Sequence, residues 1–169
     1  MIRLEQAEDH AGIRAINLQA FGGNAEADLV DKLRAHDKAI FSLVAVTEAS
    51  RLVGHILFSS IHFQPPQPTL RGLGLAPMAV LPEYQRQGWG TRLIAAGLAA
   101  ARAANYDCVV VLGHKEYYPR FGFVPASQYH LASEYAVSDA GAFMLLELRR
   151  GALQGCHGLV KYESEFDEA

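Results

Sequence analysis

The chain has 169 residues, half of them hydrophobic and a fifth charged, which is enough for one compact domain with a sizeable core. A formal net charge of −3 argues against a nucleic-acid partner, and the apolar runs are too short to span a membrane. Cys108 and Cys156 have no zinc-type spacing, so we expect no metal and a reducing, cytoplasmic location.

The first part of the chain predicts a short strand and two helices. Residues 2–4 form the strand, and apolar residues recur at helical spacing over residues 7–21 and again over residues 24–36. The spacing is carried by Ile13, Ile16 and Ala20 in the first range, and Leu29, Val30 and Leu33 form a predicted buried stripe in the second.

Residues 39–63 predict an antiparallel hairpin. They are rich in Val, Ile and Phe on both sides of a polar break at residues 47–50. Repeated prolines in residues 64–68 end the hairpin, because proline has no N–H for a sheet ladder.

A parallel crossover follows. Residues 72–81 predict a strand with Pro77 at a bulge or an edge, and residues 91–106 predict a helix whose small residues permit close packing. Residues 107–113 are a continuous apolar run of strand length, which predicts a central buried strand. Strand, helix and strand in this order make a right-handed parallel unit.

The remaining elements are shorter. They are a short helix at residues 116–123, ended by Gly122, and strands at residues 142–149 and 155–163. We expect a single domain over residues 1–164 and a frayed acidic tail over residues 165–169.

The turn between the strand and helix of the crossover, "PEYQRQGWGTRLI", holds Gly88 and Gly90 where the helix must begin. The first N–H groups of a helix lack intrahelical partners and carry partial positive charge, and glycine lets an anion approach them. The pattern predicts a phosphate-binding turn, with a simple glycine cap as the alternative. It is no dinucleotide fingerprint, which would need glycine where Leu93 stands, and no Gly-Lys-Ser/Thr triplet of a P-loop follows.

Two motifs together carry a family resemblance. The run "VLPEYQRQGWGTRLI" resembles the acyl-CoA signature of the GNAT superfamily of N-acetyltransferases, with Gln85, Gly88 and Gly90 in its defining places. The run "YYPRFGFVPA" resembles the second landmark of that family, with Tyr118 four residues before the Gly-Phe pair at Gly122. The order of elements is similar along nearly the whole chain, and the sequence resembles a bacterial subgroup of small predicted acetyltransferases.

The resemblance implies an α/β (α+β) fold of the GNAT type. Its central sheet is mixed and mostly antiparallel, with a splayed parallel strand pair and helices on both faces. It also implies acetyl-CoA as cosubstrate, with its pantetheine arm paired to the strand before the turn and its pyrophosphate on the amides of the turn. The residues implied to bind it are Met78, Ala79, Val80, Gln85, Arg86, Gln87, Gly88, Trp89, Gly90 and Thr91.

Two catalytic roles follow from the resemblance. The backbone N–H of Val80 is the implied oxyanion donor, and Tyr118 is the implied proton donor to the departing thiolate. A phenol with an unperturbed pKa of about 10 stays protonated at neutral pH. Alternatively, Tyr118 packs on the cosubstrate, or Tyr117 takes either role if the register slips by one. Arg120 either contacts a phosphate of the cosubstrate or is an ordinary surface residue.

The general base is left open. Many relatives carry a carboxylate on the strand before the turn, where this chain has none. The candidates are Glu26, His55, His114, Glu116 and a water molecule. His55, with an ordinary pKa of about 6.5, serves as a base or as a satisfied core residue.

The predicted function is that of an N-acetyltransferase. It moves the acetyl group of acetyl-CoA directly to a primary amine of a small molecule or peptide. The alternative is a non-catalytic module that binds or senses acyl-CoA. The sequence leaves open which amine accepts, whether other acyl groups are used, and whether the chain forms a homodimer.

Overall fold

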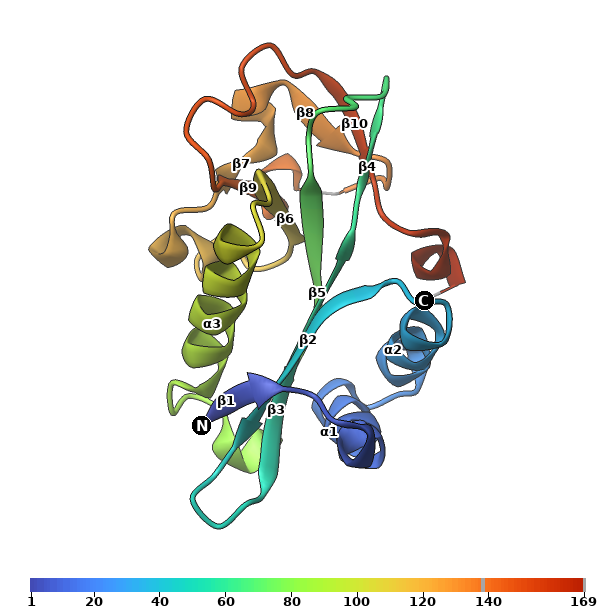
Figure 1. Ribbon diagram of the computed structural model, residues 1–169, viewed down its shortest axis with the longest axis vertical. Helices are drawn as coiled ribbons and strands as arrows, with labels where there is room; N and C mark the ends of the chain where they lie inside the picture. The colour runs from blue at the N-terminus through green and yellow to red at the C-terminus, as the bar shows by residue number, and fades with distance from the viewer. Residues whose placement is uncertain (138, 169) are drawn as a thin grey trace. The chain divides into compact units, whose positions relative to one another are not determined.

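The computed structural model describes residues 1–137 and 139–168, in two compact units (Figure 1). The first unit contains Met1–Ser59, Ala76–Ala100 and the segment from Ser164 onward, and the second contains Ser60–Leu75 and Ala101–Glu163. None of the described residues belongs to a helix long and apolar enough to cross a membrane.

The sheet of the first unit is built from β1 (Ile2–Leu4), β2 (Ala39–Val46), β3 (Leu52–Ser60) and the second half of β5 (Gly72–Val80). Neighbouring strands in this order are hydrogen-bonded, and β2 is antiparallel to both β1 and β3. The antiparallel hairpin predicted from residues 39–63 is therefore confirmed for β2 and β3.

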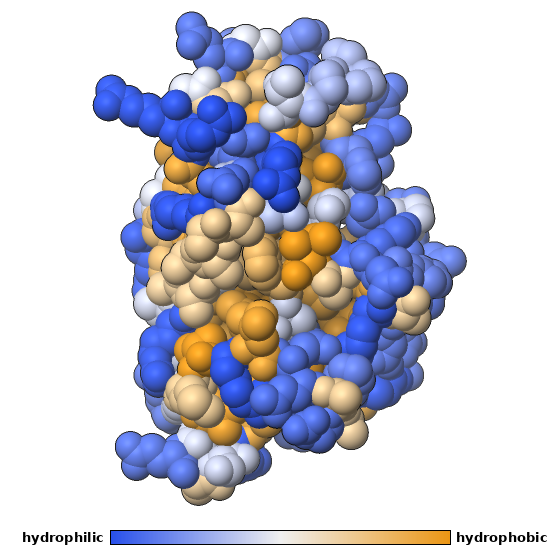
Figure 2. Space-filling view, in the orientation of Figure 1, coloured by the Kyte–Doolittle hydropathy of each residue, from blue (hydrophilic) through white to orange (hydrophobic). Residues whose placement is uncertain are grey.

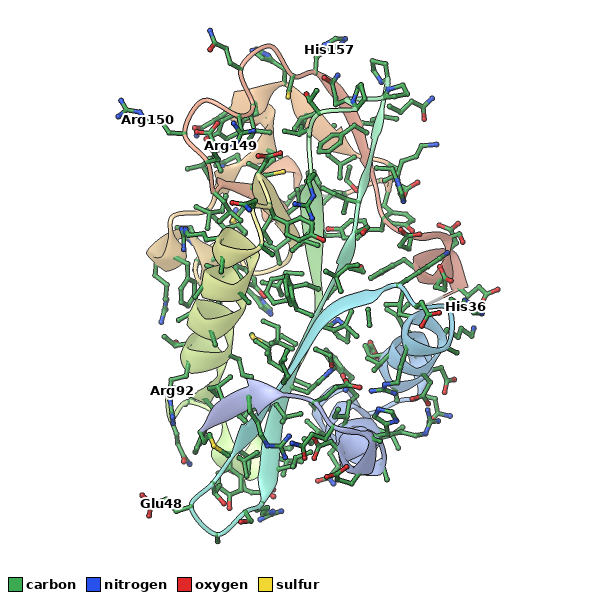
Figure 3. All side chains as sticks on the ribbon, viewed as in Figure 1. His36, Glu48, Arg92, Arg149, Arg150 and His157 are labelled. Carbon is green, nitrogen blue, oxygen red and sulfur yellow. The ribbon has the colours of Figure 1, made fainter. Side chains whose placement is uncertain are left out.

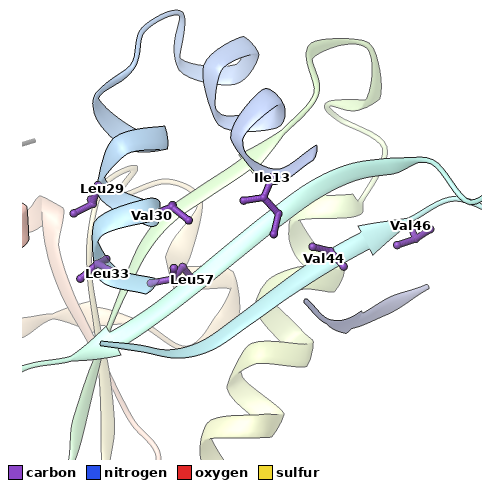
Figure 4. Packing of buried hydrophobic residues seen from close by; sticks show 7 residues of the cluster. All are labelled: Ile13, Leu29, Val30, Leu33, Val44, Val46 and Leu57. Atoms are coloured by element: carbon purple, nitrogen blue, oxygen red, sulfur yellow. The ribbon is translucent and has the colours of Figure 1, made fainter. Parts of the chain in front are cut away.

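Helices cover both faces of this sheet. α1 (His10–Phe21) and α2 (Ala25–Ala35) form a core with one face, made of Ile13, Leu29, Val30, Leu33, Val44, Val46 and Leu57 (Figure 4). α3 (Trp89–Ala103) packs on the other face, where Phe58 points. Gly97 of α3 lies so near Phe58 that an added Cβ would come within 2.3 Å of its ring, so this contact requires glycine.

The sheet of the second unit has the order β5, β6 (Cys108–Leu112), β9 (Phe143–Glu147) and β7 (Val124–Pro125). β6 is parallel to β5 and antiparallel to β9, which confirms a mostly antiparallel sheet with one parallel pair. β6 is buried from Cys108 to Val111 and lies between two strands, so its predicted central position is also confirmed.

A second sheet of the same unit was not expected. It contains three short strands in the order β4 (His62–Gln64), β10 (Gly158–Lys161) and β8 (Leu131–Ser133). The strand predicted at residues 155–163 is present as β10, but it belongs to this sheet and pairs with β4 and β8.

Short 3-10 helices connect these elements. They are η1 (Ala7–Asp9), η2 (Pro82–Tyr84), η3 (Tyr118–Phe121), η4 (Ala126–Tyr129), η5 (Ala140–Ala142) and η6 (Ser164–Glu168). η3 is the short helix predicted before Gly122, whose left-handed φ of 97° ends it as expected.

The prediction of a frayed tail is wrong for the described residues, because Ser164–Glu168 form η6 in the first unit. Glu165 is 7% exposed and accepts hydrogen bonds from Lys38 Nζ (2.9 Å) and His36 Nδ1. Burial opposes its ionisation, but these two partners lower the pKa of Glu165 to about 2. Figure 3 shows His36 beside η6.

The large apolar side chains that reach the surface are Met1, Leu4, Phe21, Ile40, Leu112 and Leu159. They come from several elements. Figure 2 shows hydrophobic residues gathered over part of one face, with hydrophilic ones around them. Exposed apolar residues are normal on a protein surface, so the six residues named above do not by themselves indicate a binding site.

Candidate functional site

The turn before α3 has the backbone shape of an anion site. Gly88 precedes the helix and accepts its first hydrogen bond, from the N–H of Arg92 (3.1 Å), so it occupies the N-cap position. Its φ of 88° is left-handed, as is that of Arg86 (62°), which is rare for a residue with a side chain. Left-handed residues in such turns direct backbone N–H groups to one side, where an anion can bind.

Open space surrounds this N-cap. A Cβ added to Gly88 would meet no atom within 4 Å, so a ligand can approach the backbone there. Arg86 and Arg92 are exposed, and the guanidinium of Arg92 lies 4.7 Å from the ring centre of half-buried Trp89 (Figure 3). Two cationic side chains beside a helix N-terminus favour a negatively charged ligand.

Side chains of the turn fix its position at the end of β5. Gln85 Nε2 donates to the carbonyl of Val80 (2.9 Å), and Gln87 Nε2 donates to the carbonyl of Glu83 (3.1 Å). The backbone N–H of Gln85 donates to the carbonyl of Pro82 (3.3 Å), inside η2. Gln85 thus ties the turn to Val80 through its side chain, a contact that the motif by itself does not predict.

Beyond Gly74, the backbone of β5 is not paired with β6 in the described part of the chain, so its N–H and C=O groups on that side can bind a ligand. Its parallel pairing with β6 covers Gly72 to Gly74, and within the described residues this register goes no further. Pro77 lies in the remaining part of β5, beyond the residues paired with β6, where its missing N–H removes no bond of that register. On the side of β3, Leu81 N–H donates to the Val53 carbonyl (2.8 Å) and holds the end of the strand.

Tyr118 is a buried phenol at the start of η3. Its side chain lies edge-on to Phe123 and Tyr117, with ring centres 5.6 and 5.3 Å away, and the residue is 6% exposed. Burial, with a smaller contribution from Tyr117, raises the pKa of Tyr118 to about 12. The phenol is therefore protonated at neutral pH.

Tyr117 and Arg120 lie together. The guanidinium of Arg120 is 4.6 Å from the ring centre of Tyr117, which is half-buried and also meets Phe121. This cation–π contact accounts for the position of Arg120 without a phosphate.

His55 is a core residue with both ring nitrogens engaged. It is fully buried, with Nε2 2.9 Å from Ser42 Oγ and Nδ1 3.4 Å from Asn17 Nδ2. The Ser42 hydroxyl donates to Glu5, so it accepts from a protonated Nε2, and Nδ1 accepts from the Asn17 amide. These contacts fit a structural histidine and give it no contact with solvent.

The other base candidates lie nearer the surface. Glu26 is half-buried in the first turn of α2, while His114 and Glu116 are exposed in the turn before η3. The carbonyl of His114 accepts the N–H groups of Tyr117 (3.0 Å) and Tyr118 (3.3 Å), so His114 shapes the backbone at the phenol.

No group of three or more His, Cys, Asp or Glu that could hold a metal ion occurs among the residues that the structure describes. Cys108 and Cys156 are buried free thiols, and burial raises the pKa of Cys108 to about 12. Such a thiol is a poor nucleophile at neutral pH.

The buried His55 predicts a pH dependence of stability. Burial lowers its pKa to about 4, against about 6.5 in the unfolded chain. Between these values the unfolded state binds more protons, so the free energy of unfolding should rise with pH across this window, by up to about 3 kcal/mol. Urea unfolding of the wild type and His55→Gln from pH 4.5 to 7 measures this change in the free energy of unfolding. If that free energy depends on pH equally in the two proteins, His55 is not the group responsible.

The sequence matches the model of the Acetyltransferase (GNAT) family over residues 4–123. It is 34% identical over 167 residues to a protein of Escherichia coli K12 named as an uncharacterised N-acetyltransferase, YhbS, covering 99% of this chain and 98% of the relative.

Two solved structures are similar along the whole chain. One is the GNAT family N-acetyltransferase YhbS of Escherichia coli in complex with CoA, with a TM-score of 0.93, 34% identity, and coverage of 99% of this chain and 91% of that one. The other is a GNAT family acetyltransferase of Brucella melitensis in complex with acetyl-CoA, with a TM-score of 0.80, 33% identity, and coverage of 99% and 97%.

Proposed function

The chain belongs to the GNAT acetyltransferase family, and from this we propose that it transfers the acetyl group of acetyl-CoA directly to a primary amine of a small molecule or peptide. The observation that carries the proposal is the turn before α3, where left-handed Gly88 opens the helix N-terminus to an anion. The complexes of the two similar proteins with CoA and acetyl-CoA support the choice of ligand.

We assign the pyrophosphate to the turn. The residues proposed to hold it are Gln85, Arg86, Gln87, Gly88, Trp89, Gly90 and Thr91. Amides of the first helical turn donate to phosphate oxygens, and Gln85 contributes by fixing the turn to Val80. Arg86 and Arg92 add positive charge nearby.

We assign the pantetheine arm to the edge of β5. Met78, Ala79 and Val80 lie beyond the residues paired with β6, and an extended chain can add to such an edge through main-chain hydrogen bonds. The N–H of Val80 is proposed to donate to the oxyanion that develops at the thioester carbonyl. The Gln85–Val80 bond supports this role, because it limits the freedom of the backbone there.

Tyr118 is proposed as the proton donor to the departing thiolate. Its raised pKa keeps the proton available at every pH where the enzyme would work. The buried, weakly acidic thiols favour direct attack by the amine over an acyl-enzyme. Because His55 is sealed in the core, we propose that the proton of the attacking amine leaves through water and not through His55, with Glu26, His114 and Glu116 as the side-chain alternatives.

We propose that the two compact units, with η6 included, act as one catalytic domain in the bacterial cytoplasm. Shared elements support the first part, because β3, β5 and α3 each contain residues of both compact units. The free cysteines and the bacterial relatives support the second.

The test is binding followed by turnover. Acetyl-CoA at about 100 times its Kd should stabilise the fold by about 2.7 kcal/mol, which raises the Tm of a chain of this size by roughly 5–10 °C. Incubation with a panel of primary amines should then release CoA, measured by thiol titration. Binding without release for any amine would favour the non-catalytic acyl-CoA module, and no binding would contradict both.

A further inference from the structure

The second unit contains a cavity of about 210 Å³ that the roles above do not use. It is lined by Ser127, Leu131, Ala132, Ser133, Tyr135, Val137 and Phe143, which come from η4, β8, the segment after β8 and the start of β9. Drug-sized ligands occupy pockets of about 300–1,000 Å³. This cavity therefore suits one side group of a larger molecule.

The lining is neutral and mostly apolar. Among the described residues, its side-chain polar groups are two serine hydroxyls and one phenol, and the Ser133 Oγ accepts the N–H of Tyr135 (3.1 Å). Acidic residues close by in the chain are engaged: Asp139 pairs with Lys115 (2.8 Å), and Glu134 accepts the N–H of Tyr162 (2.9 Å). A charged group would lose hydration in such a lining without gaining a countercharge, so a neutral group fits better.

One wall of the cavity leads to Tyr118. Phe143 pairs with Leu112 at the end of β6, and the next residue, Gly113, donates its N–H to the Ala142 carbonyl (3.0 Å). Gly113 in turn packs on Tyr118, since an added Cβ would lie 3.2 Å from the phenol ring.

Another lining residue, Tyr135, leads to the point where β5 and β6 cease to pair. The Tyr135 ring stacks on Tyr162, with ring centres 6.2 Å apart and an interplanar angle of 27°. Tyr162 covers Gly74, where an added Cβ would lie 2.6 Å from its ring, and Gly74 is the last residue of β5 in the parallel register. The first wall thus adjoins Gly113, which packs on the proposed proton donor, and Tyr135 adjoins β5 through Tyr162, at the end of its parallel register.

We infer that this cavity is the specificity pocket for the acceptor: it takes a neutral, largely apolar side group, of the size of one amino-acid side chain, carried by the primary amine. The inference rests on the proposed acetyl transfer and narrows its substrate class. Amines such as leucine amide or phenylalanine amide fit it, and polycationic amines do not.

A charge placed in the lining tests the inference. The wild type should prefer leucine amide over glycine amide by at least about 10-fold in kcat/KM, since even one methylene in an apolar pocket changes kcat/KM by about 10-fold or more. Val137→Asp should lower this preference about 10-fold or more and leave the KM for acetyl-CoA unchanged. Ala136→Asp is the matched control, because it adds the same charge at an exposed neighbour outside the lining and should keep the preference.

Three results would overturn the inference. In the first, the wild type shows no preference in kcat/KM for leucine amide over glycine amide. In the second, Val137→Asp and Ala136→Asp change this preference equally. In the third, Val137→Asp changes the preference among acetyl-, propionyl- and hexanoyl-CoA and leaves the preference among amines unchanged. The last result would make the cavity an acyl pocket of the donor.

Binding of a product separates this inference from the proposed function. N-acetyl-leucine amide needs no thioester chemistry, and its binding can be followed by ligand-observed NMR with and without CoA. Binding that is lost in Val137→Asp and kept in Ala136→Asp supports the cavity even if no amine releases CoA. Release of CoA from glycine amide, with no Val137-dependent binding, would refute the cavity and leave the acetyl transfer standing.

Discussion

Tyr118→Phe should lower kcat by about 10²–10⁴-fold while acetyl-CoA affinity changes far less. The substitution keeps the buried ring that packs edge-on against Phe123 and removes the hydroxyl, the one proton that the side chain can give. General acid catalysis contributes about this factor, and its loss appears in kcat and not in ground-state binding. Steady-state kinetics with the best amine, together with calorimetric titration of acetyl-CoA, measures both quantities.

The pH profile gives a second test of Tyr118. Because burial raises the pKa of Tyr118 to about 12, the wild type should lose no activity through this group between pH 7 and pH 10. A basic limb near pH 10 that disappears in Tyr118→Phe would show that the phenol titrates as an exposed tyrosine does.

Tyr117→Phe is the control for the assignment. Tyr117 is a neighbouring phenol, half-buried under Arg120, and its loss should leave kcat near the wild-type value. If Tyr117→Phe loses the rate and Tyr118→Phe keeps it, the two roles are exchanged. If neither substitution lowers a rate limited by chemistry, the tyrosine-acid hypothesis is wrong.

Gly88→Asp should abolish acetyl-CoA binding, seen as the loss of thermal stabilisation by the ligand. An aspartate at the N-cap would place its carboxylate on the amides that the phosphates need, and its charge would repel them. The side chain has room, since no atom lies within 4 Å of an added Cβ, so the cost to the fold is the left-handed φ of 88°, about 1–2 kcal/mol.

Two controls separate charge from backbone strain. Gly88→Asn has nearly the same shape, and asparagine tolerates the left-handed region, so it should weaken binding less than aspartate does. Gly22→Asp adds the same residue at another open left-handed glycine, at the end of α1, and should leave binding unchanged. Unaltered affinity in a folded Gly88→Asp protein would refute the phosphate assignment.

The sequence predicts those parts of the fold whose pattern of apolar residues is strong and local. The hairpin of β2 and β3 follows from two runs of Val, Ile and Phe around a polar break, and the order β5, α3, β6 follows from a clear change of period. The strands β4 and β8 have three residues each, too few to show any period, so their sheet could not be predicted. The tail was mispredicted because the partners of Glu165 lie far away in the sequence.

The same distinction holds for the candidate site. Gly88 at the start of α3 is visible in the sequence, because glycines next to a helix start are a local pattern. The left-handed backbone of Arg86 and the bond from Gln85 to Val80 are not, since neither residue type implies its conformation or partner. His55 and its partners Asn17 and Ser42 belong to three different elements, and Asn17 lies 38 positions before His55 in the sequence. Only the tertiary structure brings these residues together.

The division of the chain between the two units also has a consequence for biosynthesis. Each unit combines separate stretches of sequence, and the first unit includes Glu165, which lies 129 residues after its partner His36. At about 5–20 residues per second, a ribosome needs roughly 6–26 s to make that stretch. During this time His36 and Lys38 have been translated while their common carboxylate has not. Docking of η6 therefore has to follow translation of nearly the whole chain, however early β1 to β3 assemble.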